Sequence, residues 1–285
     1  MTLEDETASI AATPEKAGET GTGTEGELKA FFRPAPLPRP IPGLLAFTCI
    51  FLSLLVDAGV GQLVRGLVAD SPKLEMRIPT ETGELSEPIE YSESNDSARM
   101  LLSRTISLPL DIVMVLGILW LSGFSPAESL GLTLRRIPGS LRYGVTAAVL
   151  TIPIVLAVNV STRMIFPPDH THPAFELFHS GDASLVLMAT VTAVVFAPFI
   201  EELLFRGLLQ SSLSNFMGAW PAIAMIGVLF GLAHFAIWPD PIPLSLLGIL
   251  LGLTMARTQS LWAPVFYHAF FNATMLLLSL ILNGG

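Results

Sequence analysis

Charged side chains are scarce in this sequence, and long stretches contain none at all. Lys, Arg, Asp and Glu make up 14% of the 285 residues, against about 25% in an ordinary soluble domain. Hydrophobic residues reach 51%, and the mean hydropathy is +0.62. The apolar residues form long uninterrupted runs, which excludes a soluble globular protein and indicates a chain that crosses a membrane several times.

The sequence also lacks the features of several other classes. Cys49 is the single cysteine, which excludes an intrachain disulfide framework and a multi-cysteine zinc site. Residues 1–29 contain no apolar segment of the secretory type, so we expect the first long apolar run, from Gly43, to remain as a transmembrane helix.

The net charge of −9 does not indicate a nucleic-acid partner. Residues 1–42 hold seven acidic and four basic side chains, and residues 70–99 hold eight and three, so these two polar stretches carry −3 and −5. The acidity therefore belongs to the solvated segments, and we expect no nucleic-acid binding.

The hydrophobic runs predict an all-α, polytopic transmembrane bundle of about seven helices with a disordered N-terminal tail. A span needs roughly 20 apolar residues, and seven segments qualify, of which 242–258 is the shortest: 44–68, 104–124, 141–166, 183–211, 219–238, 242–258 and 261–283. The predicted organisation has three parts: a disordered acidic and then Pro-rich tail over 1–42, accessory helices over 43–182 with an acidic loop near 70–102, and a C-terminal transmembrane domain over 183–283.

The flanking charges favour a cytoplasmic N-terminus. Arg135, Arg136 and Arg142 cluster between the second and third spans, whereas 167–182 contains no Lys or Arg. Arg65, Lys73, Arg77 and Arg99 on the opposite side weaken this asymmetry. We expect an integral, multi-pass location, with the plasma membrane of a prokaryote as the first expectation.

Two pairs of glycines lie four residues apart within the predicted spans. Gly227 and Gly231 form one pair, and Gly248 and Gly252 form the other. Small residues at this spacing allow two helix backbones to approach closely in lipid, so we interpret these glycines as packing positions.

The fourth span contains the densest set of ionisable groups, in the string PFIEELLFRG. Adjacent residues of a helix point about 100° apart, so Glu201 and Glu202 cannot share one environment. Glu202 and Arg206 are four apart and can pair on one face. This division predicts one structural carboxylate, Glu202, and one chemical carboxylate, Glu201.

Two further spans carry imidazoles. His234 follows Phe230 by four residues in the fifth span, and Asn272 follows His268 by four in the seventh. His234 lies 234 − 201 = 33 positions after Glu201, with a turn near the midpoint. Antiparallel helices would therefore bring Glu201 and His234 to similar depth, and the seventh span could add its own pair from the side.

This set of side chains suits hydrolysis of an amide by an activated water. A carboxylate and a histidine can hold and deprotonate the water, while hydrogen-bond donors stabilise the oxyanion that forms. The mechanism needs no cofactor and no metal. The motifs of the usual rival hydrolases, His-Glu-x-x-His and Gly-x-Ser-x-Gly, are absent from the sequence.

The three motifs together resemble the CPBP family of intramembrane glutamic endopeptidases, also called the CAAX protease and bacteriocin-processing or Abi family, which includes the type II CAAX prenyl endopeptidase. The motifs are Glu-Glu-x-x-x-Arg, Phe-x-x-x-His and His-x-x-x-Asn, within residues 183–281. The resemblance implies that Glu201 and His234 activate the water, that His268 and Asn272 form the oxyanion site, and that Glu202, Arg206 and Phe230 support them. It implies a peptide or membrane-protein substrate within the lipid bilayer.

Other interpretations remain open at this point. The chain could be a non-catalytic scaffold or a bacteriocin self-immunity protein on the same fold, or a small transporter that uses Glu and His as a relay. His170, His172 and His179 lie in a polar stretch, where a solvated loop is favoured over a metal site. Asp57, Asp111 and Asn159 lie in the first three spans, where helix–helix hydrogen bonds are favoured over a conduction pathway.

Overall fold

The structure, a computed structural model, describes residues 41–68, 92–167, 183–235 and 238–283. All regular elements in these ranges are helical. Six helical stretches are long and apolar enough to cross a membrane: Gly43–Leu67, Ala98–Leu121, Pro126–Ile165, Ala183–Met217, Pro241–Thr258 and Trp262–Ile281. The predicted all-α bundle is confirmed. The predicted disordered tail, most of the acidic loop and the three histidines at 170, 172 and 179 lie outside the described residues.

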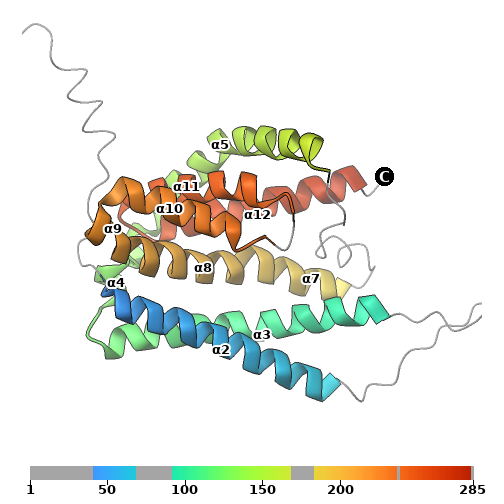
Figure 1. Cartoon of the computed structure of the whole chain (residues 1–285), viewed down its shortest axis with the longest axis horizontal. Helices are drawn as coiled ribbons and strands as arrows, with labels where there is room; N and C mark the ends of the chain where they lie inside the picture. Colours follow the sequence, from blue (N-terminus) through green and yellow to red (C-terminus); the bar gives the residue numbers. More distant parts are fainter. Residues whose placement is uncertain (1–40, 69–91, 168–182, 236–237, 284–285) are drawn as a thin grey trace, which may run out of the picture. The chain divides into compact units, whose positions relative to one another are not determined.

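The helices form two groups on either side of a central rod (Figure 1). The rod runs from Ala183 to Met217 and contains α7 (Ala183–Val191), α8 (Ala197–Glu202) and α9 (Ser211–Met217). On one side lie α2 (Gly43–Val68) and α3 (Ser92–Leu121). On the other side lie α5 (Ile137–Ile165), α10 (Ala219–Leu232), α11 (Pro241–Thr258) and α12 (Trp262–Asn283). The short α4 (Pro126–Ser129) connects α3 towards α5.

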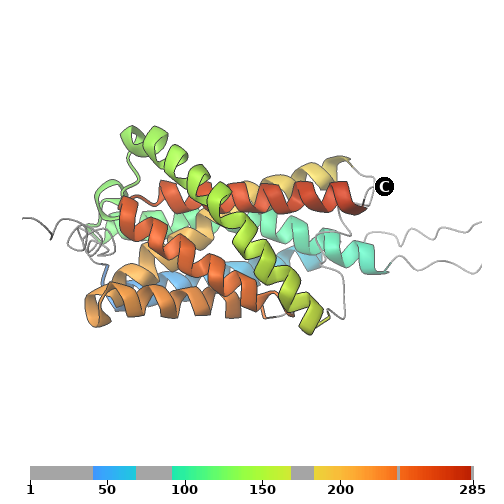
Figure 2. The ribbon, with the colours of Figure 1, turned by 90° about the horizontal axis from the view of Figure 1, so that it is seen from above.

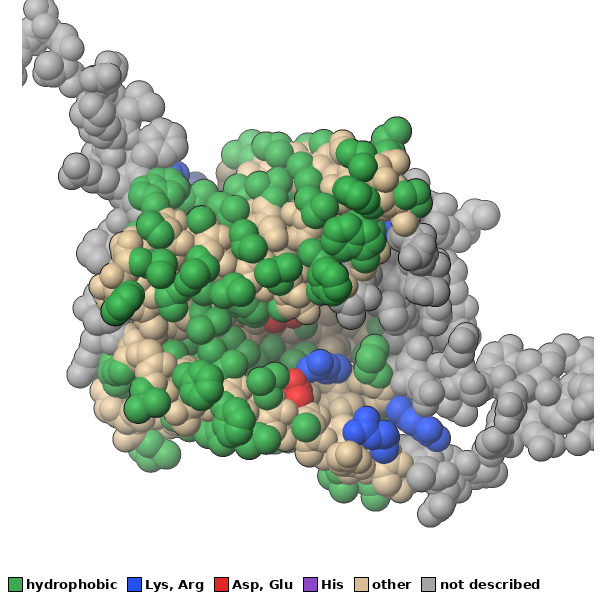
Figure 3. All heavy atoms as spheres, viewed as in Figure 1, with side chains coloured by type: hydrophobic (Ala, Val, Ile, Leu, Met, Phe, Trp, Pro, Cys, Tyr) green, Lys and Arg blue, Asp and Glu red, His purple; other side chains and the backbone are tan. Residues whose placement is uncertain are grey.

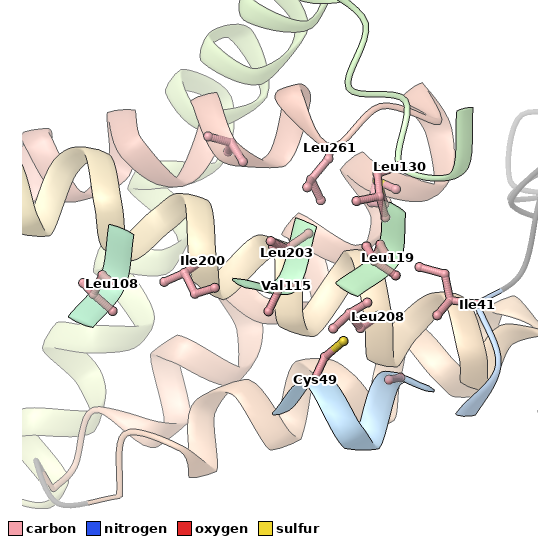
Figure 4. Packing of buried hydrophobic residues seen from close by; sticks show 13 residues of the cluster. Ile41, Cys49, Leu108, Val115, Leu119, Leu130, Ile200, Leu203, Leu208 and Leu261 are labelled. Carbon is pink, nitrogen blue, oxygen red and sulfur yellow. The ribbon is translucent and has the colours of Figure 1, made fainter. Parts of the chain in front are cut away.

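The bundle has two large apolar clusters. The first joins α2, α3 and the rod to one end of α11 and α12, and includes Cys49, Leu203, Met255 and Val265 (Figure 4). The second joins α5, α10, α11 and α12, with Phe230 among its fully buried members. The rod therefore contacts both groups, and its side chains can meet residues from α12 and α11.

The fifth predicted span is shorter than expected. Its helix, α10, ends at Leu232 after 14 residues, which is a rise of about 21 Å against roughly 30 Å of hydrocarbon. The N–H groups of His234 and Phe235 bond to the carbonyls of Gly231 and Leu232 in tight turns. His234 therefore lies in a turn at the end of a helix, where the sequence predicted a helix interior. The 242–258 segment, the shortest of the seven, does form a helix of full span length.

The glycine pairs lie where α10 and α11 touch, as predicted. A Cβ placed on Gly227 would lie 2.7 Å from the backbone nitrogen of Ile249, and one on Gly248 would lie 2.7 Å from the carbonyl oxygen of Gly227. A similar close approach occurs at Gly144, where α5 crosses α12 (Figure 2): a Cβ there would lie 2.5 Å from the carbonyl oxygen of Ala263. Absence of a side chain permits both contacts.

We expect Gly231→Ala to destabilise the bundle. Its Cβ would lie 2.3 Å from the carbonyl oxygen of Pro241 and 2.8 Å from the backbone nitrogen of Ser245, so the helices must separate, at a cost of about 1–3 kcal/mol. Thermal unfolding in detergent measures the effect. Gly117→Ala on α3 is the matched control, because nothing lies within 4 Å of its added Cβ. Equal melting of both variants would contradict the packing role.

Candidate active site

The helix that carries the two glutamates is irregular on both sides of them. A π-helical segment, Thr192–Phe196, precedes α8, and a second one, Leu203–Gln210, follows it. Such segments inside α-helices are frequent at functional sites. Glu201 and Glu202, the last two residues of α8, therefore lie between two changes of helical pitch.

Glu202 and Arg206 form the ion pair that their spacing predicts. Arg206 Nη1 donates to Glu202 Oε1 over 2.9 Å, and both side chains are fully buried. Arg206 Nη2 also donates to the carbonyl oxygen of Gly248 on α11, over 3.0 Å. Four residues further along each helix, Gln210 donates to the carbonyl oxygen of Gly252. The rod is thus joined to α11 by two polar contacts in the same register.

His268 lies between the two carboxylates. Its Nδ1 lies 2.9 Å from Glu202 Oε1, and its Nε2 lies 3.8 Å from Glu201 Oε2. A carboxylate only accepts hydrogen bonds, so the short contact requires a proton on Nδ1. In the neutral imidazole, Nε2 then presents its lone pair towards Glu201. Glu202 therefore determines the tautomer and the orientation of the ring.

Glu201 differs from Glu202 in its surroundings, as predicted. The Glu201 side chain is 28% exposed, whereas Glu202 has no exposed surface. Figure 3 shows a hollow in this face of the bundle, between the two groups of helices, with acidic side chains in it. Glu201 is therefore the carboxylate of the pair that water or a substrate can reach.

Phe230 contacts one charged group and three rings of the site. The Arg206 guanidinium lies 4.5 Å from the centre of the Phe230 ring, a cation–π contact in a desolvated place. The rings of His234, Phe205 and His268 lie 5.1, 5.2 and 5.6 Å away. Phe230 thus packs against both imidazoles.

His234 contacts the backbone of its own helix. Its Nδ1 lies 2.9 Å from the carbonyl oxygen of Phe230, one helical turn earlier. Of the described residues, His268 and not His234 has a polar contact with Glu201. The neutral ring leaves the Nε2 lone pair of His234 for a water or a substrate, so its participation in water activation stays a prediction.

The Asn272 side chain donates a hydrogen bond to the backbone of the rod. Its Nδ2 donates to the carbonyl oxygen of Ala193 over 2.8 Å. In the π-helical pattern the N–H of Ala197 bonds to the Thr192 carbonyl, five residues earlier. The equivalent donor for Ala193 would be Pro198, which has no N–H. Asn272 therefore supplies the hydrogen bond that Pro198 cannot make, and the oxyanion role that the resemblance implies for it stays a prediction.

We expect Asn272→Ala to lose about 1–3 kcal/mol of stability, because it leaves the partly buried Ala193 carbonyl without this donor. In a Pro198→Ala background the same change should cost less, since residue 198 regains an N–H. Thermal unfolding of the four proteins in detergent gives this comparison. An equal loss in both backgrounds would contradict the link to Pro198. Activity that stays low in the stable double variant would indicate a second, substrate-directed role for Asn272.

Two cavities lie away from these residues. One, of about 600 Å³, lies between α2 and α3, and the other, of about 550 Å³, lies along α5 near Arg142 and Tyr143. Within the described ranges, no three His, Cys, Asp or Glu side chains are grouped to hold a metal ion.

The comparisons with known proteins agree with this geometry. Residues 183–274 match the sequence model of one family, described as Type II CAAX prenyl endopeptidase Rce1-like. This part of the chain is similar to the CAAX endopeptidases. No curated protein and no solved structure matches the chain.

The match confirms the resemblance that the three motifs carry, and it includes all seven predicted site residues. Together with the six spans, the match indicates a membrane protein whose C-terminal part is similar to the CAAX endopeptidases.

Several functional contacts are not visible in the sequence. The His268–Glu202 hydrogen bond joins residues 66 positions apart, and no local pattern selects it. The bond from Asn272 to Ala193 had one signal, namely Pro198 in the middle of an apolar span, which must leave a carbonyl without its donor.

Proposed function

We propose that the chain is an intramembrane endopeptidase that hydrolyses a peptide bond with a water held between Glu201 and His268. The observation that carries this proposal is the 3.8 Å approach of Glu201 Oε2 and His268 Nε2. With Nδ1 protonated towards Glu202, two acceptor atoms face one another. Two acceptors at this distance need a donor between them, either a shared proton or a water that donates to both. The partial exposure of Glu201 favours the water.

The chemistry then follows from the positions of these groups. Glu201 takes a proton from the water as its oxygen attacks the carbonyl carbon of the substrate. The tetrahedral intermediate breaks its carbon–nitrogen bond when Glu201 returns this proton to the leaving nitrogen. The products are a carboxyl group, which contains the water oxygen, and an amine. No covalent enzyme intermediate is formed.

The supporting residues have separate tasks in this mechanism. Glu202 orients His268, and Arg206 balances the charge of Glu202 within the protein. The resemblance assigns His234 to the water and His268 to the oxyanion. The contacts favour His268 beside the water, with the second N–H of Asn272 and the His234 ring directed towards the substrate.

A comparison of peptides tests the proposal. Membranes that contain the wild-type protein or Glu201→Gln are incubated, and the released and membrane-bound fragments are identified by mass spectrometry with terminal labelling. We expect fragments with new termini in the wild-type sample only. Full biological effect of Glu201→Gln without any difference in fragments would favour the non-catalytic scaffold or self-immunity role. If wild-type proteoliposomes show an ion flux and Glu201→Gln abolishes it, a transporter is favoured.

A further inference from the structure

One helix, α5, contacts both of the elements that carry the imidazoles of the candidate site. It lies obliquely across α12, which carries His268 (Figure 2). Its last turn contacts the segment between α10 and α11, which follows His234. This helix lies outside the residues that match the family model. Its contacts can therefore affect the site without belonging to any of the three motifs.

The first contact joins α5 to α12 beside His268. The hydroxyl groups of Thr151 on α5 and Tyr267 on α12 share a hydrogen bond, and Tyr267 immediately precedes His268 in the chain. Tyr267 is 1% exposed, so its ring is fixed inside the bundle. The close approach of the two backbones at Gly144 lies about two turns earlier on α5. The position of α12 relative to α5 is thus fixed by backbone packing and by a hydrogen bond.

The second contact lies at the other end of α5. Arg163 Nη2 donates to Asp240 Oδ1 over 2.6 Å, and the two side chains are 35% and 14% exposed. Three residues further on, the Phe166 ring packs edge-on against Trp238, with 5.6 Å between the ring centres. The end of α5 therefore holds residues 238–240 by an ion pair and by an aromatic contact, which together fix the orientation of this segment.

The same segment supports the turn that contains His234. The Trp238 ring lies 6.0 Å from that of Phe235, the residue after His234. Asp240 is the N-cap of α11, and the first turn of α11 lies directly against Gly231. Because the His234 ring bonds only one turn back along its own helix, its position in the site follows the position of this helix end.

We propose that Arg163 and Asp240 are positioning residues, which hold His234 in place relative to His268 through α5. In the proposed protease function, on which this inference rests, the His234 ring is directed towards the substrate. Thr151 and Arg163 lie 163 − 151 = 12 residues apart, a rise of about 18 Å along one helix. Partly exposed ion pairs contribute little to global stability, so loss of this pair should affect the site and not folding.

Loss of either charge should slow catalysis without weakening substrate binding. We expect Arg163→Gln and Asp240→Asn each to lower kcat about ten- to a hundredfold, since a displacement of about 1 Å can cost on the order of 100-fold. KM and the melting temperature should stay near the wild-type values. Arg163→Lys keeps the charge and should recover most of the rate. Arg142→Gln, exposed near the start of the same helix, is the matched control and should cleave like wild type.

The double variant shows whether the two residues act as a pair. Arg163→Gln combined with Asp240→Asn should be no slower than either single variant, because each substitution removes the same ion pair. Losses that multiply would show that the two side chains act separately, and would overturn the positioning role. A raised KM with an unchanged kcat would also overturn it, since these side chains would then act in substrate binding.

Histidine NMR of the full chain in detergent tests the placement without a substrate. With isotope-labelled imidazoles, His234→Gln and His268→Gln assign the two signals. We expect Arg163→Gln and Asp240→Asn to shift the His234 signal and to leave that of His268 in place, and Arg142→Gln to leave both in place. An unshifted His234 signal in both ion-pair variants would overturn the positioning role. A shifted signal in a protein whose wild type cleaves no peptide would support the positioning and reject the protease function alone.

Discussion

Glu201→Gln should reduce peptide cleavage by about 10²- to 10⁴-fold, the usual contribution of a positioned general base. Glutamine has the same size and can still hydrogen-bond to a water, but it cannot take the proton. The side chain is partly exposed, so the substitution should leave the melting temperature close to that of wild type. Single-turnover cleavage by purified protein in proteoliposomes, with a peptide found in the fragment comparison, measures the rate.

The matched control is Glu128→Gln, in the first turn of α4. Its side chain is exposed and lies outside the rod, so it should cleave at the wild-type rate. A Glu201→Gln protein that retains more than about a tenth of the wild-type rate would contradict the role of this carboxylate.

Arg206→Met should be among the most destabilising single substitutions in the protein. It removes one partner of a fully buried ion pair and leaves the Glu202 carboxylate uncompensated, which costs about 3–5 kcal/mol. The cation–π contact with Phe230 and the hydrogen bond to Gly248 are lost as well. Thermal and chemical unfolding in detergent measure the change.

The double variant Arg206→Met with Glu202→Gln separates stability from activity. It contains no unpaired buried charge, so it should recover much of the lost stability. It should not recover cleavage, since a neutral glutamine no longer fixes the His268 ring through a charged hydrogen bond. A double variant as unstable as Arg206→Met alone would contradict the ion-pair account, and a fully active one would contradict the orienting role of Glu202.

The bundle and the residues of the candidate site could be predicted because membrane-spanning helices produce strong sequence patterns. Charge-free runs identify the spans, and Glu201, Glu202, His234 and His268 are conspicuous because ionisable groups inside a span are costly. Helical spacing was sufficient to pair Glu202 with Arg206 and to place Gly227 and Gly231 at a helix contact. Each of these predictions depends on one helix or on one pair of neighbouring helices.

The remaining features depend on how distant segments fit together. Apolar composition could not reveal that α10 ends at Leu232, because the turn at His234 is followed by residues as apolar as those of a helix. Nor could spacing decide which imidazole faces Glu201, since the fifth and seventh spans both allow it. That choice depends on how α12 packs against the rod, which brings His268 to Glu201 and Glu202 and is a tertiary feature.

A structure of the protein in lipid, at a resolution that shows ordered water, tests the central claim most directly. Our account predicts one water within about 2.6–3.2 Å of both Glu201 Oε2 and His268 Nε2, with His268 Nδ1 bonded to Glu202. A Glu201 carboxylate turned away from both imidazoles, with no water between it and His268, would contradict the account.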